Sequence, residues 1–205
     1  MFTGIVKETG IIEKVQYVNS GIELVVRISY QLGSTLKLKS NLALDGQVFT
    51  VLKKKDDEDS CLLYFYLSHP RKLEIYRGKK KINLETAIRA GEEIPGSLFS
   101  GIPSGTAQVL ALTQISSDKW LLEVYWETFL LNYLDIKDRV CLDGVLLRIK
   151  QIVGSSIFFE LYGDTLKLTN LEKRKKGDSI NIEVDPMVKK IAQIFEKLKN
   201  KGGGQ

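Results

Sequence analysis

Residues 44–51 read LDGQVFTV, and residues 142–149, 98 positions further along the chain, read LDGVLLRI. The same spacing places INLE at 82–85 on INIE at 180–183. Matches that stay in order at one spacing mark a repeated structural unit. The sequence therefore predicts a tandem duplication in which both halves have the same fold.

A further repeated segment marks where the two halves begin. Residues 2–5 read FTGI and residues 99–102 read FSGI, within one residue of the same spacing. We expect these segments to be equivalent first strands. The halves are predicted to span residues 1–90 and 98–185, joined by a linker that contains glycine and proline.

Each half shows the pattern of short β-strands. Residues 21–30, GIELVVRISY, and 119–127, KWLLEVYWE, alternate apolar and polar side chains, as half-buried strands do. Turn residues such as those of LDG separate such runs. Several short strands without helical periodicity predict a small closed barrel in each half, because closure leaves no exposed sheet edge.

The last predicted element is a helix over residues 186–200. Apolar residues recur there at helical spacing, with lysines between them: Met187, Ile191, Ile194 and Leu198. Asp185 is placed to cap the helix and Pro186 to occupy its first turn. So narrow an apolar stripe needs a surface to cover it, which a partner chain or the protein's own barrels would supply.

Composition limits the class of protein. Of the 205 residues, 43% are hydrophobic and 27% charged, which is typical of a soluble globular protein. The absence of a long apolar stretch or an export signal, together with only two cysteines, predicts a cytoplasmic protein without a membrane partner. The net charge is +5, but acidic residues interrupt the lysine runs, so we expect no nucleic-acid surface. One histidine and two separated cysteines predict no metal site.

A duplicated barrel of this length that opens MFTGIV and ends NIEVDP before a helix resembles the riboflavin synthase family. DTLKLTNL at 164–171 and KKGDSINIEVDP at 175–186 add to the likeness, which covers the whole chain. The resemblance implies an all-β fold of two six-stranded Greek-key barrels with a C-terminal trimerisation helix, assembled as a homotrimer. It also implies a dismutation without a cofactor, in which two molecules of 6,7-dimethyl-8-ribityllumazine give riboflavin and a pyrimidinedione by four-carbon transfer.

The resemblance implies one ligand pocket in each barrel, lined partly by main-chain groups of the first strand. Gly4, Ile5 and Val6 are the expected strand residues of the first barrel, and Gly101, Ile102 and Pro103 those of the second. The other expected pocket residues of the first barrel are Val48, Phe49, Thr50, Tyr64, Phe65, Tyr66 and Leu67. Those of the second barrel are Lys137, Leu146, Leu147, Arg148, Glu160, Leu161, Tyr162, Gly163, Asp164 and Thr165. The expected catalytic residues are Phe2, Thr3 and Asp185.

Several positions depart from the family pattern. Val48 stands where cysteine is common, and Leu146 and Arg148 stand where serine and threonine are common. The segment at 95–102 reads PGSLFSGI and lacks the two histidines of the family's GGHxxxGH pattern. The chain's own histidine, His69, precedes a proline and is predicted to be a turn residue rather than a base.

These losses remove most side chains that could transfer a proton. Three interpretations stay open: a riboflavin synthase that works by positioning its substrates, a non-catalytic binder of lumazine or a flavin, and a trimeric scaffold with vestigial pockets. Arg148 is predicted to lie inside the second barrel and to face the pocket with Leu146, while Leu147 faces away. It would then need a partner, namely Asp164, Glu160, Asp185 or the phosphate of flavin mononucleotide. The alternative is that its charged end reaches the rim.

Overall fold

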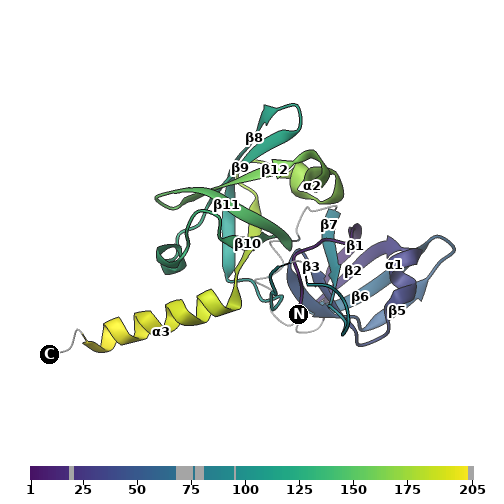
Figure 1. The fold of residues 1–205 in the computed structure, drawn as a ribbon. Coiled ribbons are helices and arrows are strands. Elements are labelled where there is room, and N and C mark those ends of the chain that lie inside the picture. The colour runs from purple at the N-terminus through teal and green to yellow at the C-terminus, as the bar shows by residue number, and fades with distance from the viewer. Residues whose placement is uncertain (19–20, 68–75, 77–80, 95, 203–205) are drawn as a thin grey trace.

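The strands form two β structures joined by a linker, and one long helix extends away from the second (Figure 1). This computed structural model describes residues 1–18, 21–67, 76, 81–94 and 96–202. Strands β1 to β7 make up the N-half, and strands β8 to β13 make up the C-half. None of the helices in these ranges is long and apolar enough to cross a lipid bilayer.

The C-half is a closed six-stranded barrel, as the sequence predicts. Its strands follow the order β10-β11-β12-β9-β8-β13, and pairing of β13 with β10 closes the ring. Along β12 the buried side chains of Ile157, Phe159 and Leu161 alternate with more exposed ones, which directs one face of the strand into the core. The bounds are β8 Gly105–Ser116, β9 Lys119–Tyr125, β10 Arg139–Leu142, β11 Val145–Val153, β12 Ser156–Tyr162 and β13 Ser179–Val184.

The N-half has the same ring order, but one strand is interrupted. Its described strands form a seven-stranded sheet in the order β4-β3-β7-β1-β2-β6-β5. The two end strands, β4 and β5, are separated in the chain by only Val51 and Leu52. Together they stand where β11 stands in the C-half, so the sheet curls into a half-barrel. The bounds are β1 Glu8–Val18, β2 Gly21–Ser29, β3 Asn41–Leu44, β4 Gln47–Thr50, β5 Lys53–Asp56, β6 Ser60–Leu67 and β7 Lys81–Thr86.

Short helices interrupt both halves, which the strand pattern did not predict. α1 (Tyr30–Thr35) follows β2, and α2 (Gly163–Leu168) follows β12. Two 3-10 helices, η2 (Phe129–Tyr133) and η3 (Leu171–Lys173), lie in the C-half. Each is too short to show the apolar periodicity by which a helix is found in a sequence.

The predicted C-terminal helix is α3 (Pro186–Gly202), and one of its faces packs on the C-half. Asp185 Oδ1 accepts the N–H of Met187 at 2.8 Å, which is the predicted cap. The rings of Tyr133 and Phe195 stack with centroids 6.4 Å apart. The Tyr133 hydroxyl also donates to Glu196 Oε1 at 2.7 Å.

The 98-residue spacing does not hold along the whole chain. In the N-half Leu24 lies opposite Phe65, and in the C-half the equivalent Leu122 lies opposite Phe159. Phe65 therefore corresponds to Phe159 at a spacing of 94, because the hairpin between β5 and β6 is four residues longer than its counterpart.

The opening segments of the two halves are exchanged. Phe2 and Phe99 form an antiparallel bridge with N–H to O=C distances of 2.9 and 2.8 Å. Beyond the bridge, the Gly4 carbonyl accepts the N–H of Leu146 in the C-half at 2.9 Å. The Gly101 carbonyl accepts the N–H of Val48 in the N-half at 2.8 Å. Each half therefore receives the first segment of the other.

Two buried carboxylates hold the exchanged segments. Glu85 Oε1 accepts the N–H and the hydroxyl of Thr3, at 2.6 and 2.8 Å. Glu183 Oε1 accepts the same two groups of Ser100, at 2.8 and 2.6 Å. Burial raises the pKa of both carboxyl groups above the ordinary value, although the donors they accept oppose that shift.

The halves meet back to back at the two LDG turns. Asp45 and Asp143 are fully buried, and each accepts a main-chain N–H of its own half through Oδ1, from Asn83 and Asn181 respectively, at 2.8 Å. The two asparagine side chains cross between the halves. Asn83 Nδ2 donates to the Asp143 carbonyl and Asn181 Nδ2 to the Asp45 carbonyl, both at 2.9 Å. This exchange has approximate two-fold symmetry.

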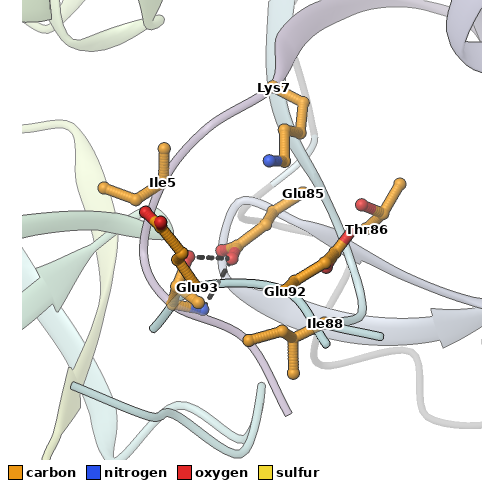
Figure 2. Close-up of a pocket in the computed structure, with 8 residues that line it drawn as sticks. Ile5, Lys7, Glu85, Thr86, Ile88, Glu92 and Glu93 are labelled. Atoms are coloured by element: carbon orange, nitrogen blue, oxygen red, sulfur yellow. Dashed lines mark hydrogen bonds between the residues drawn. The ribbon is translucent and has the colours of Figure 1, made fainter. Parts of the chain in front are cut away.

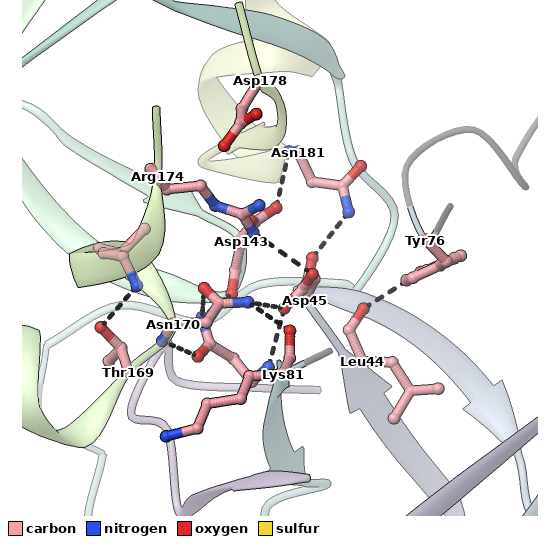
Figure 3. Close-up of polar contacts among 12 residues, drawn as sticks. Leu44, Asp45, Tyr76, Lys81, Asp143, Thr169, Asn170, Arg174, Asp178 and Asn181 are labelled. Carbon is pink, nitrogen blue, oxygen red and sulfur yellow. Dashed lines mark hydrogen bonds and ion pairs between the residues drawn. The ribbon is translucent and has the colours of Figure 1, made fainter. Parts of the chain in front are cut away.

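Two C-half side chains break that symmetry (Figure 3). The Arg174 guanidinium forms an ion pair with the Asp143 carboxylate and lies 3.6 Å from Asp45 Oδ2. Asn170 donates through Nδ2 to Asp45 Oδ1 at 2.9 Å, and its main-chain N–H donates to Asn83 Oδ1 at 2.7 Å. These polar contacts matter for stability because a buried charge without a partner is costly.

We expect Arg174→Met to lower the free energy of unfolding by about 3 kcal/mol, because it removes the guanidinium from a buried carboxylate. Arg27→Met is the matched control, since Arg27 pairs with Glu13 on the surface and such pairs contribute less than about 1 kcal/mol. Denaturant unfolding measures both variants. Equal losses would show that the buried ion pair adds nothing to the stability of the interface.

We also expect the stability of the protein to depend on the protonation of Glu183. Its folded-state pKa lies above the ordinary 4.5 because the side chain is buried, so the folded protein keeps the proton to a higher pH than the unfolded chain does. The free energy of unfolding therefore falls as pH rises through the folded pKa.

The measurement is the pH dependence of unfolding, compared with that of Glu183→Gln, which cannot titrate. The difference between the two proteins should grow in favour of the variant as pH rises above 4.5. Glu172→Gln, at an exposed glutamate, is the control and should leave the slope unchanged. A constant difference between the native protein and Glu183→Gln would contradict the prediction.

Candidate functional site

Each half opens at the same place in its ring of strands. In the C-half, β11 and β12 pair only through Ile149–Val153 and Ser156–Phe159. Residues 145–148 of β11 keep their pairing with β10 alone, and residues 160–162 of β12 keep theirs with β9 alone. Two neighbouring strands therefore diverge and leave a strand edge open.

The N-half opens at the equivalent position. β4 pairs with β3 only, while residues 65–67 of β6 pair with β2 only, among the residues that the structure describes. The carbonyls of Gly101 and Gly4 reach these edges at Val48 and Leu146 respectively. The expectation that Gly4–Val6 serves the first barrel and Gly101–Pro103 the second is therefore wrong, because the bridge between Phe2 and Phe99 crosses the segments over.

The open edges present main-chain hydrogen-bonding groups. Adjacent residues of a strand point their N–H and C=O groups to opposite sides. Because the Val48 N–H faces the open edge, the Val48 carbonyl and both groups of Thr50 face it as well. The same reasoning applies to Leu146 and Arg148. Because the Val48 and Leu146 N–H groups are bonded to the glycine carbonyls, the Val48 carbonyl, both groups of Thr50 and their C-half equivalents are left to face the edge of a flat heterocycle that carries amide-like groups.

The side chains beside the open edges all point outward from the barrels. In the N-half these are Val48, Thr50, Tyr64, Tyr66 and the exposed Ile102. In the C-half they are Leu146, Arg148, Glu160, Tyr162 and the exposed Ile5. Apolar and aromatic groups around a row of polar main-chain atoms are typical of a site for a planar ligand.

Five of the predicted pocket residues turn inward instead. Their side chains are buried in the two hydrophobic cores, so only their main-chain groups can reach a ligand; these residues are Phe49, Phe65, Leu67, Leu147 and Leu161. Strand alternation produces this division.

Arg148 lies on the outer face of the barrel and is exposed, next to Leu146 and away from the core. The prediction that it lies inside the barrel is wrong, because the inward positions of β11 are taken by Val145, Leu147 and Ile149. The expected acidic partners are engaged elsewhere. Glu160 pairs with Lys150 at 2.9 Å, and this contact lowers the pKa of its carboxyl group.

Other predicted residues lie at the margins of the C-half site. Lys137 has a φ of 76° in the turn before β10, and Val6 packs against the C-half core. The Gly163 N–H donates to the Asp118 carbonyl at 3.3 Å. Asp164 and Thr165 lie in α2. Pro103 follows the exchanged segment and is only partly buried.

Two lysines cover tyrosine rings near the open edges. Lys53 Nζ lies 5.0 Å from the ring centroid of Tyr64, and Lys119 Nζ lies 5.3 Å from that of Tyr162. Cation–π contacts of this kind are favourable, and they bring positive charge to the side of each site.

The three predicted catalytic residues have structural partners. Phe2 is 3% exposed in the bridge with Phe99, the Thr3 hydroxyl donates to Glu85, and Asp185 caps α3. His69 lies outside the described residues. The structure thus places Phe2 and Thr3 at the crossing of the exchanged segments, between the two sites.

A cavity of about 460 Å³ lies beside the N-terminal segment. Figure 2 shows the Glu85 side chain in the wall of this cavity, where its carboxylate accepts the N–H and the hydroxyl of Thr3. The lining residues are Thr3, Ile5, Lys7, Glu85, Thr86, Ile88, Glu92 and Glu93. Carboxylates outnumber the single ammonium group here, so the cavity disfavours an anion. Among the described residues no cluster of histidine, cysteine, aspartate or glutamate has a metal-binding arrangement.

Sequence reasoning missed Glu85, Glu183 and Arg139 as residues that shape the sites. Glu85 and Glu183 are the last residues of the INLE and INIE repeats. The recurrence of a charged residue at this position was the signal that could have identified them. Arg139 lies directly opposite Arg148 across β10 and β11. No sequence motif marks it, because the pairing becomes visible only with the strand register.

Comparisons with known proteins identify relatives of this chain. The lumazine binding domain family matches residues 100–185. A riboflavin synthase of Brucella abortus (strain 2308) is 25% identical over 204 residues, covering 97% of this chain and all of that protein. A yellow fluorescent protein of Aliivibrio fischeri is 28% identical over 189 residues, covering 90% of this chain and 95% of that protein.

Solved structures with the same fold are complexes. The crystal structure of LumP with riboflavin matches with a TM-score of 0.79 and 23% identity, covering 90% of this chain and 99% of that one. The structure of LumP with flavin mononucleotide matches with a TM-score of 0.77 and 22% identity, and the match covers the same fractions of the two chains. The chain therefore matches the lumazine binding domain family over residues 100–185 and is similar over nearly its whole length to riboflavin synthases, with the fold of LumP.

Proposed function

We propose that this protein binds 6,7-dimethyl-8-ribityllumazine or a flavin at the open strand edges of its two halves, without turning the ligand over efficiently. The observation that carries the proposal is the pair of edges at Val48–Thr50 and Leu146–Arg148, each completed by a glycine carbonyl of the other half. Their main-chain donors and acceptors match the amide-like edge of a pteridine or flavin ring.

The side chains at these edges favour binding over chemistry. The outward groups nearest the glycine carbonyls are the apolar Val48 and Leu146, which neither accept nor donate a proton. Among the described residues, the carboxylates near the crossing are committed to main-chain and hydroxyl donors, as Glu85 and Glu183 show. General acid–base catalysis needs a group within hydrogen-bond reach of the reacting atom.

A second candidate function is riboflavin synthase itself. The full-length match to a riboflavin synthase favours it. Stacking two lumazines in the right geometry would supply much of the rate enhancement, since well-oriented reactants gain up to roughly 7–11 kcal/mol. In this case Phe2, Thr3 and Asp185 would be the residues closest to the proton transfers. Assignment to the cytoplasm remains a prediction from the sequence.

Incubation of the purified protein with the lumazine separates the two functions. We expect the lumazine's fluorescence to change on binding, with no riboflavin detected by chromatography beyond a protein-free control. Formation of one riboflavin for every two lumazines consumed would overturn the non-catalytic proposal and support the synthase. Absence of any binding would overturn both.

Gly101→Ala provides a test of the site in the same assay. Gly101 has a φ of 74°, and a Cβ there would lie 2.8 Å from Phe2 Cε2 and 3.0 Å from the Val48 Cβ. The variant should lose roughly tenfold in N-half affinity, the equivalent of one hydrogen bond. Gly154→Ala is the matched control, because Gly154 also has a positive φ, 58°, but a Cβ there meets nothing within 4 Å. Thermal unfolding of both variants separates loss of affinity from loss of fold.

We further propose that the protein is a homotrimer held together by α3. Val188 and Ala192 pack against the C-half core, whereas the adjoining apolar stripe of the helix remains exposed. That stripe consists of Met187, Ile191, Ile194 and Leu198. A contiguous exposed apolar stripe is typical of an interface.

Ile191→Glu combined with Leu198→Glu should dissociate the assembly, because two carboxylates would enter an apolar contact. Sedimentation equilibrium should change from the mass of three chains to that of one. Lys197→Glu, at an exposed position of the same helix, is the control and should leave the mass unchanged. A native protein that sediments as a single chain would contradict the trimer.

A further inference from the structure

One cross-strand pair differs sharply between the two halves. In the N-half Asn41 lies opposite Thr50, and in the C-half Arg139 lies opposite Arg148. These pairs are equivalent at the 98-residue spacing. The equivalence agrees with the contacts of Val48 and Leu146, 98 residues apart, which each donate a main-chain N–H to a glycine carbonyl of the other half. Directly opposed side chains point to the same face of a sheet, and here that face is the outer one beside the candidate site.

The N-half pair is neutral and internally satisfied. The Thr50 hydroxyl donates to Asn41 Oδ1 at 3.2 Å. The C-half pair instead places two arginines at directly opposed positions of neighbouring strands, on the same face. Like charges directly opposite each other destabilise a sheet, so the C-half carries a cost that its twin avoids.

No described carboxylate relieves that cost. Within the described ranges neither Arg139 nor Arg148 forms an ion pair, and the nearby acids are engaged, Glu160 with Lys150 and Asp164 with Lys167. Among the residues that the structure describes, the one hydrogen bond of these guanidinium groups runs from Arg139 Nη1 to Ser97 Oγ at 3.4 Å.

The linker is shaped to make room for Arg139. Gly96 has a φ of 124°, and a Cβ at this position would collide with the Arg139 guanidinium. The side chain is therefore partly enclosed on one side by residues 96 and 97, while its partner Arg148 is open to solvent. Two arginines that extend from opposed positions on one face supply the donors that a phosphate monoester needs, because guanidinium groups bind phosphate in a bidentate manner.

The pair also lies within reach of a ligand at the open edge. Leu146, whose N–H binds the Gly4 carbonyl, is two residues from Arg148 on the same outer face, about 7 Å along the strand. We propose that Arg139 and Arg148 form a phosphate site that makes the C-half select a phosphorylated flavin, while the N-half, with Asn41 and Thr50, does not discriminate. This inference rests on the proposed binding function.

Calorimetric titration with flavin mononucleotide and with riboflavin tests the inference. The native protein should show one site that prefers the phosphorylated flavin by at least about tenfold, and a second site without preference. Arg148→Gln and Arg139→Gln should each lower the affinity for flavin mononucleotide by about 10- to 100-fold, the range for a charge-assisted hydrogen bond, and should lower the affinity for riboflavin by much less, so that the preference for the phosphorylated flavin is lost. Arg148→Lys should keep part of the preference.

Two further variants keep the test independent of folding defects. Arg27→Gln removes a positive charge from the N-half surface and should change neither affinity. Thr50→Arg combined with Asn41→Arg places the C-half pair in the N-half and should create a preference for flavin mononucleotide there. Inorganic phosphate should compete with flavin mononucleotide at the C-half and leave riboflavin bound.

The outcomes separate the two proposals. Equal affinity of both native sites for flavin mononucleotide and riboflavin would overturn the phosphate site and leave flavin binding intact. A preference that survives both glutamine variants, or phosphate that displaces both flavins equally, would also overturn it. Failure of lumazine, riboflavin and flavin mononucleotide alike to bind would overturn the proposed function, and the phosphate site with it.

Discussion

Close contact between the backbones of Gly46 and Gly144 determines how the two halves meet. A Cβ at Gly46 would lie 2.7 Å from the Gly144 nitrogen, and a Cβ at Gly144 would lie 2.8 Å from the Gly46 nitrogen. Only glycine permits this approach at the positive φ that both residues adopt. The approach brings Asp45 and Asp143 into reach of the opposite half's asparagines, and it places the two first segments where they can cross.

The polar cluster around that contact makes one arrangement of the halves far more favourable than others. Buried carboxylates and amides add little net stability, but they penalise any docking that leaves them unpaired. Glu85 and Glu183 act in the same way on the exchanged segments. The geometry of both candidate sites therefore depends on contacts made at the centre of the molecule, some distance from the open edges.

Much of the fold could be predicted from the sequence, because duplication and strand alternation are local or periodic signals. The exchange could not, since FTGI and FSGI fit an edge strand of either half equally well. The longer β5–β6 hairpin shifted the correspondence of Phe65 by four residues, and no periodicity reveals an insertion in a turn. For the candidate site, resemblance named residues of β4, β6, β11 and β12, which are the strands at the open edges. The strand register was needed to show that Leu147 faces the core and that Arg148 faces Arg139.

The crossing of the first segments also has a consequence for ancestry. A single half, taken alone, would have an open strand edge and a free first segment able to fill the edge of another copy. Two such copies, related by a true two-fold axis, would reproduce the reciprocal contacts of Gly4 with Leu146 and Gly101 with Val48. The present chain has the arrangement of two such copies joined end to end, and joining them lets the two faces differ in charge, with Arg139 and Arg148 on one side and Asn41 and Thr50 on the other.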